Sequence, residues 1–314
     1  MTRFARLAVV VVVSTFVLIG LGGFVRAMEA GLGCPDWPTC YGSPNPPSTL
    51  AAGPLKLAWI EHSHRLWAGV LIVLIAVLAV AARRSGQPRS TRLAAYLLVP
   101  AVLSQAVLGA VVVWAKLDAE SVALHLAGAM IVLALATYVA LRALGLGPAA
   151  DAAPPRPVRL PVVVAVVTFA QMVLGSLVTG YEAGLAYATF PSFNGSALPP
   201  VLRTLPQWLH VAHRGVALLL VLLLGALVLA ARDFGDRGVR RAAHVAAMLV
   251  AVQIALGAAN IWSQLSGWSV VPHLVVGSGI WVCVLVVALR WRWGHAPAAA
   301  RNMIRTVPTS VTAA

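Results

Sequence analysis

Eight apolar stretches, each long enough to cross a lipid bilayer, set the limits on how this chain can fold. The sequence has 314 residues, of which 60% are hydrophobic and only 10% are charged. A soluble domain carries about 25% charged residues, so this composition is that of a membrane protein. We therefore expect an all-α membrane protein with eight transmembrane helices. The expected spans are 7–26, 60–82, 93–115, 122–141, 160–180, 208–231, 242–262 and 270–289.

Basic side chains give these spans an orientation. Most arginines fall in alternate connections, on the side that also holds both termini, whereas the opposite connections hold only Arg26, Lys56, Lys116 and Arg203. This positive-inside pattern predicts a multi-pass protein of a bacterial-type plasma membrane, with the N- and C-termini in the cytoplasm. The net charge of +14 then reflects orientation in membrane lipid, and no nucleic-acid partner is expected.

The chain is also a tandem repeat. Residues 20–33 resemble residues 173–186, and residues 105–117 resemble residues 253–265. Such self-similarity predicts two pseudo-symmetric four-helix bundles with the same orientation. It also makes the first span a helix rather than a cleaved signal peptide, because the fifth span repeats it. The expected parts are an N-terminal half (1–144), a cytoplasmic linker (145–159), a C-terminal half (160–290) and a mobile cytoplasmic tail (291–314).

Four histidines occupy matching positions in the two halves: His64 and His125 in the first, His213 and His273 in the second. Equivalent histidines are 149 and 148 residues apart, and each precedes the arginine that ends its span by 17 or 19 residues. At about 1.5 Å per residue, all four rings lie roughly 26–29 Å from the cytoplasmic face. This places them near the extracytoplasmic side of a hydrocarbon layer about 30 Å thick.

The set of four favours haem ligation over a structural role. A single histidine near a helix end is usually interfacial, but ionisable side chains inside a membrane are costly and point to function. Parallel helices that carry imidazoles at one depth can ligate both faces of a porphyrin, with pairing either within a half or across the halves. Because the chain has no C-x-x-C-H motif, such a haem would be held non-covalently.

Glycines recur once on each odd-numbered span, where they permit close packing of helices or leave room for a flat ligand. They are Gly22, Gly109, Gly175 and Gly257.

Arginines follow directly on the first histidine of each half. Arg65 succeeds His64, and Arg214 succeeds His213. Because a guanidinium binds carboxylates in a bidentate manner, we expect these two side chains at haem propionates. The alternative is that they only reach the membrane interface.

The two halves differ three residues before these histidines, where Glu61 of the first half is replaced by His210. The i, i+3 spacing puts Glu61 on nearly the same helix face as His64. A carboxylate there can accept a proton, orient water or stabilise positive charge, although a solvated glutamate at a helix N-terminus remains the alternative. We expect chemistry in the first half and electron transfer in the second. His62 lies about 200° round the helix from His64 and is not expected to face the same site.

The first extracytoplasmic loop contains Cys34 and Cys40, in an oxidising compartment. A disulfide, a redox-active thiol pair and a metal site are all compatible with this loop, although a metal ion wants more ligands than the loop supplies. Cys283 stands in the middle of the last span and is expected to be a packing residue.

Taken together, these features resemble the haem A synthase family over the chain up to about residue 290. The resemblance rests on eight spans in two repeats, the E-x-x-H-R pattern of residues 61–65, the three further histidines and the cysteine pair. It implies an oxidoreductase that oxidises the C8 methyl group of haem O to a formyl group, with oxygen derived from water, for the assembly of terminal oxidases. It also implies haem O as substrate, haem O synthase (the protohaem farnesyltransferase) as its supplier and an unidentified electron acceptor.

The resemblance implies a role for each candidate residue. The substrate haem would lie between His64 and His125, with Arg65 beside it, and Glu61 would be the catalytic carboxylate. His213 and His273 would ligate the iron of a haem b cofactor, with Arg214 at its propionates, and Cys34 and Cys40 would form the loop disulfide of the family. Some members carry a second cysteine pair between the fifth and sixth spans, but this chain has none between Tyr181 and Gln207.

The residues alone also allow two other classes of protein. A di-haem b-type electron carrier acting as a quinol oxidoreductase would contain protohaem only and would give Glu61 no special role. A thiol–disulfide oxidoreductase or a transporter that uses the Cys34 and Cys40 loop would show no haem absorption.

Overall fold

Eight long helices make up nearly all of the computed structural model, which describes residues 1–147 and 159–293. Each is long and apolar enough to cross a membrane, so the prediction of an all-α multi-pass membrane protein is confirmed. Within the described residues there is no β-strand, only a short 3₁₀ helix, η1 (Ala183–Leu185), and two isolated bridges. The helices are α1 (Arg3–Ala27), α2 (Ala52–Arg84), α3 (Arg89–Trp114), α4 (Ala119–Ala143), α5 (Arg159–Gly180), α6 (Leu205–Ala231), α7 (Arg237–Trp262) and α8 (Gly267–Trp293).

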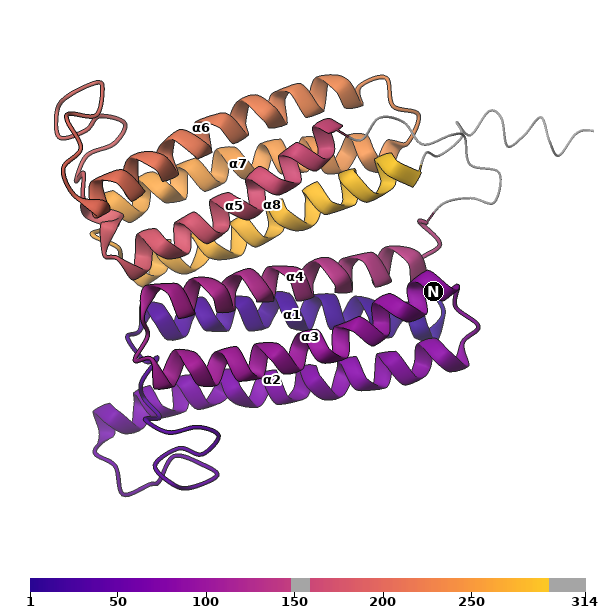
Figure 1. Ribbon diagram of the computed structural model, residues 1–314, viewed down its shortest axis with the longest axis horizontal. Coiled ribbons are helices and arrows are strands. Elements are labelled where there is room, and N and C mark those ends of the chain that lie inside the picture. Colours follow the sequence, from indigo (N-terminus) through magenta and orange to yellow (C-terminus); the bar gives the residue numbers. More distant parts are fainter. Residues whose placement is uncertain (148–158, 294–314) are drawn as a thin grey trace, which may run out of the picture.

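The helices form two groups of four that lie side by side (Figure 1). In the first group α1 and α3 each pack against both α2 and α4, and in the second α5 and α7 each pack against both α6 and α8. The groups meet where α1 and α4 contact α8 and where α4 contacts α5. The two long loops, between α1 and α2 and between α5 and α6, lie at the end of the molecule opposite the N-terminus.

Each group has its own apolar core, and a third cluster joins them. Leu78 and Leu98 are central to the first core, and Leu227 and Val284 are central to the second. The joining cluster contains Trp281 of α8, whose indole N–H donates to a backbone carbonyl of α4 at 3.0 Å. Because lipid surrounds the bundle, the outward faces of the helices stay apolar and exposed.

Polar caps begin several helices where the sequence leaves the apolar pattern. Asp118 accepts a hydrogen bond from the backbone N–H of Ser121 at the start of α4. Thr204 and Gln207 form a reciprocal capping box at the start of α6. These caps satisfy N–H groups that have no acceptor within the first helical turn.

Most helices begin a few residues before the expected spans, and the largest difference is at the second helix. The second helix begins at Ala52 rather than near residue 60. Its first two turns are mostly exposed, with only Ala58 buried against both cysteines of the loop. The last helix continues to Trp293, three residues into the segment expected to be a tail. The rest of that tail (294–314) and the central part of the expected linker (148–158) lie outside the described residues.

Candidate functional site

The four histidines lie on the even-numbered helices and face each other within each half. The rings of His213 and His273 have centroids 6.4 Å apart and planes inclined by 52°. The side chains of His64 and His125 lie within electrostatic range of each other. The pairing that the spacing left open is therefore α2 with α4 and α6 with α8.

Each histidine packs against one of the four recurring glycines. A Cβ placed on Gly22 would lie 3.2 Å from Cε1 of His64, and one placed on Gly175 would lie 3.1 Å from Cε1 of His213. The corresponding distances are 3.4 Å from Gly109 to His125 and 3.3 Å from Gly257 to His273. The glycines thus allow an odd-numbered helix to approach the edge of each imidazole, as expected for close packing, and the room they would leave for a flat ligand stays a prediction.

These rings fit the axial ligands of a haem iron. The Nδ1 atoms of all four are buried without a hydrogen-bond partner among the described residues. Two metal–nitrogen bonds of about 2 Å in line, plus two ring radii of roughly 1.2 Å, span about 6.4 Å, the separation of the second pair. No group of three or more His, Cys, Asp or Glu side chains that could hold a metal ion occurs in the described part of the chain. A pair of imidazoles therefore suits an iron whose other ligands come from a porphyrin.

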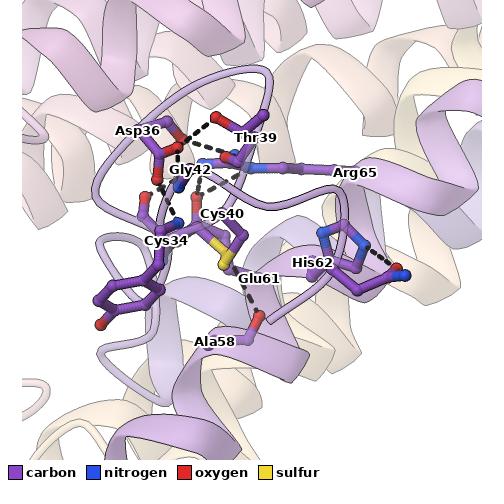
Figure 2. The surroundings of a disulfide bond; sticks show 11 residues. Cys34, Asp36, Thr39, Cys40, Gly42, Ala58, Glu61, His62 and Arg65 are labelled. Carbon is purple, nitrogen blue, oxygen red and sulfur yellow. Dashed lines mark hydrogen bonds and ion pairs between the residues drawn. A yellow bond between two sulfur atoms is a disulfide. The ribbon is translucent and has the colours of Figure 1, made fainter. Parts of the chain in front are cut away.

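The loop above the first pair is closed by a disulfide between Cys34 and Cys40, whose Cα atoms are 4.7 Å apart. Figure 2 shows this loop folded onto α2. The Sγ atom of Cys34 lies 3.7 Å from the backbone oxygen of Ala58. Of the three readings left open for the cysteine pair, the structure has the disulfide.

Glu61 binds this loop and the side chain of Arg65. One carboxylate oxygen accepts the backbone N–H of Cys34 at 2.8 Å, and the other forms an ion pair with Arg65 (Figure 2). Glu61 is only 4% exposed, which excludes the alternative of a solvated glutamate at a helix end. His210 stands at the equivalent place in the second half, and the division of chemistry and electron transfer between the halves stays a prediction.

Arg65 has a different set of partners from the one expected. Its Nε and Nη2 atoms donate to Glu61, and its remaining N–H groups donate to the backbone oxygens of Cys34, Asp36 and Thr39 at 2.8–3.2 Å. A guanidinium has five N–H donors, and all five are used within the protein. Because the loop folds over the N-terminal part of α2, Arg65 has no N–H group left for the haem propionate that was its expected partner.

Arg214 binds the backbone of the second loop in the way that Arg65 binds the first. It donates to the backbone oxygens of Tyr187, Thr189 and Ser192 at 2.7–3.4 Å and lies 4.9 Å from the ring centroid of Phe193. These contacts use three of its five N–H donors, and its contact with a haem propionate stays a prediction.

The two loops are copies of each other. The acceptors of Arg214 are each 153 residues beyond the acceptors of Arg65. The bridge from Cys40 to Ser43 likewise recurs from Phe193 to Ser196. In the second loop, Tyr187 and Phe193 stand where the cysteines stand in the first, with ring centroids 5.2 Å apart in an edge-to-face arrangement. An aromatic pair thus occupies in the second loop the positions that the disulfide occupies in the first.

The carboxylate of Asp36 organises the interior of the first loop. It accepts hydrogen bonds from the Thr39 hydroxyl and from the backbone N–H groups of Tyr41 and Gly42, at 2.5 and 2.9 Å for the two backbone donors. Slight burial raises the pKa of Asp36, but these hydrogen bonds outweigh it and hold that pKa below its usual value.

His62 and His210 both serve the loops rather than the ring pairs. The Nε2 atom of His62 lies 3.3 Å from the Asn45 side-chain oxygen. The Nδ1 atom of His210 lies 2.8 Å from the Ala183 carbonyl oxygen. Cys283 is a partly buried free thiol beside the second core, in agreement with a packing role.

One residue beside the histidines is missing from the expected set. Gln171 of α5 donates from Nε2 to the backbone oxygen of His213 at 2.9 Å, and the same atom lies 3.4 Å from the ring Nε2 of His213. Residues 20–33 are similar to residues 173–186, and the same offset pairs Gln171 with Leu18. This difference between the repeats could have marked Gln171 as a candidate.

Comparison with known proteins places this arrangement in a family. Residues 5–285 match the COX15-CtaA family, described as cytochrome oxidase assembly protein. The chain belongs to this family. It is 29% identical over 283 residues to Heme A synthase of Halalkalibacterium halodurans, a match that covers 85% of this chain and 91% of the relative. It is 27% identical over 329 residues to Heme A synthase of Shewanella oneidensis, covering 93% and 97%. The resemblance to haem A synthases drawn from the sequence is confirmed.

Proposed function

We propose that this protein is a haem A synthase, which oxidises the C8 methyl group of haem O to a formyl group. The observation that carries the proposal is the pair His213 and His273, at the 6.4 Å separation that an iron between two imidazoles requires, in a chain of this family. The conversion of a methyl to a formyl group with oxygen from one water molecule releases four protons and four electrons. The protein must therefore bind haem O, accept protons near its edge and pass electrons to an acceptor.

The two halves divide these tasks. His64 and His125 hold the substrate haem, and His213 and His273 ligate a non-covalent haem b, which supplies electron transfer when bound. Glu61 supports this division, because the carboxylate occurs only in the first half, while His210 takes its place in the second.

Glu61 acts on the substrate side as a base or as a negative charge that stabilises a cationic intermediate of the substrate. The ion pair with Arg65 and the hydrogen bond from the Cys34 N–H fix the carboxylate in one orientation. A positioned carboxylate of this kind contributes about 10²–10⁴-fold to a proton-transfer step. Arg65 is then a positioning residue for Glu61 and the loop rather than a ligand of the propionates.

Exposed tryptophans support a site near the extracytoplasmic face. They are Trp59, Trp208 and Trp268. Each stands five residues before one of the ligand histidines, and amphipathic indoles concentrate at membrane interfaces. The ligand rings are then about 7.5 Å below the interface along the helix axis. A haem enters such a site from the outer part of the bilayer, where we place its transfer from haem O synthase.

Separate replacement of Glu61 by Gln and His210 by Gln tests the assignment. Co-expression with haem O synthase, followed by haem extraction and chromatography, measures the haem A formed. We expect Glu61→Gln to lose at least about 100-fold in rate while it still accumulates haem O, and His210→Gln to retain most of the activity. If only His210→Gln abolished haem A formation, the roles of the halves would be reversed. Recovery of protohaem alone from wild-type protein would instead favour the di-haem carrier.

A further inference from the structure

Glutamines flank the glycine–histidine contacts at three of the four ligand positions. Each stands four residues before its glycine and shares a helix face with it. They are Gln105, Gln171 and Gln253. The side-chain oxygens of all three are buried without a partner among the described residues. At the fourth position Leu18 precedes Gly22, so the glycine that packs against His64 is preceded by an apolar residue in place of the glutamine.

Gln171 is the member of this set that contacts a ligand histidine in both its backbone and its ring. The amide nitrogen donates to the His213 backbone oxygen at 2.9 Å and lies 3.4 Å from Nε2 of the same residue. The contact joins α5 to α6 at the level of the ring. It therefore restrains the position of His213 along the helix axis, in addition to the packing against Gly175.

In the first half, the equivalent helices α1 and α2 are joined by a hydrogen bond at a different position. Leu18 packs against the apolar core of that half. The indole N–H of Trp67, on the turn after His64, donates to the backbone oxygen of Ser14 at 3.1 Å. This bond fixes α1 against α2, while the His64 side chain makes no hydrogen bond within residues 1–147 and 159–293.

We propose that Gln171 is the positioning residue that makes the second half retain its haem, and that Leu18 in the equivalent place lets the first half exchange its haem. This inference rests on the proposed function, in which the first site takes up a substrate and releases a product while the second keeps a cofactor. The hydrogen bond from Gln171 to the backbone oxygen of His213 leaves the ring lone pairs available to iron. It lowers the freedom of this residue in the free site, so less ordering remains to be supplied when iron binds. An apolar neighbour gives no such restraint.

The test measures haem loss from full-length protein in detergent after loading with protohaem, with apomyoglobin as the acceptor. Wild-type protein is expected to show a fast and a slow phase, the slow one being absent in His213→Ala. Gln171→Met, which has nearly the same shape but no donor, should accelerate the slow phase about 3- to 10-fold, the effect of a single hydrogen bond. It should also shift the low-spin electron paramagnetic resonance signal of that haem. Leu18→Gln should slow the fast phase by a similar factor.

The matched control is Val166→Met, on the lipid-facing side of α5, where the residue is 63% exposed; both phases should match wild type. An unchanged slow phase and spectrum in Gln171→Met overturns the role of Gln171. If Gln171→Met does not accumulate, Leu18→Gln tests the proposal that Leu18 permits haem exchange. An unchanged fast phase in Leu18→Gln overturns that proposal. Full haem retention in His213→Ala would instead contradict the proposed function, since the second site would then not hold haem through that residue.

Discussion

Gly175 packs against the imidazole edge of His213, at a distance that leaves no room for a side chain. A Cβ on the glycine would lie 3.1 Å from Cε1 of the ring, closer than ordinary van der Waals contact. A Cβ on Gly22 or Gly257 would lie similarly close to His64 or His273, at 3.2 and 3.3 Å, and one on Gly109 would be in ordinary contact with His125 at 3.4 Å. The position of each ring is therefore set by the neighbouring odd-numbered helix as well as by its own.

Gly175→Val should displace His213 and weaken haem binding in the second half. Overpacking of a tight contact costs about 1–3 kcal/mol, which corresponds to a loss of affinity of about 5- to 140-fold. Pyridine haemochromogen titration of purified protein measures the haem bound per chain. Gly225→Val is the control on α6, because nothing lies within 4 Å of a Cβ at that position. Equal haem content in both variants would contradict the assigned contact.

Arg65→Lys should release the first loop while the second loop stays folded. Lysine offers three donors on a single nitrogen, so it cannot reach Glu61 and the three backbone oxygens together. We expect the protein to lose about 2–4 kcal/mol of stability, since each hydrogen bond to a charged group contributes about 1.5–3 kcal/mol. Limited proteolysis followed by mass spectrometry should then show cleavage within residues 33–43.

Arg203→Lys is the control for this experiment, since Arg203 makes its hydrogen bond through the backbone N–H. A protease-resistant loop combined with loss of haem would restore the propionate role that the sequence predicted for Arg65.

Removal of the disulfide should act on the first half alone. A cross-link that closes so short a loop stabilises a protein by about 2–3 kcal/mol, so the double variant Cys34→Ala, Cys40→Ala should lower the unfolding temperature and weaken haem O binding. Haem b in the second half should remain, because the Tyr187 and Phe193 pair closes that loop. The reciprocal variant, Tyr187→Ala with Phe193→Ala, should reverse the pattern. Equal losses at both sites in either variant would show that the loops are coupled.

The sequence predicts the helices, the repeat and the four histidines because each depends on one-dimensional quantities. Hydropathy defines the spans, and the intervals of 149 and 148 residues place the rings at one depth. The hydrogen-bond partners of Arg65 do not follow from such quantities, since they include backbone oxygens that come together only when the loop is folded. The sequence repeat also does not show that the cysteine pair is equivalent to Tyr187 and Phe193. The loops repeat at 153 residues and the following helices at 149, because the first half has four more residues between its loop and His64.

Acid should unfold the first loop before the second. In the first loop the backbone N–H of Tyr41 donates to the Asp36 carboxylate at 2.5 Å; at the equivalent place in the second, the N–H of Asn194 donates to the neutral hydroxyl of Thr189 at 2.7 Å. Because hydrogen bonds lower the pKa of Asp36 in the folded loop, the stability they add is fully present above its unfolded pKa of about 3.9. That stability is lost as the pH falls through the lower folded value.

Hydrogen exchange, corrected for the intrinsic pH dependence of the rate, measures this difference within one molecule. Protection of the Tyr41 amide should be constant from about pH 8 to pH 5 and fall below about pH 4, whereas protection of the Asn194 amide should not change over that range. Asp36→Asn removes the charge that accepts three hydrogen bonds, so the Tyr41 amide should be weakly protected already at neutral pH. Parallel loss of protection at both amides on acidification would place the titrating group outside the loop, since Thr189 has no proton to gain in this range.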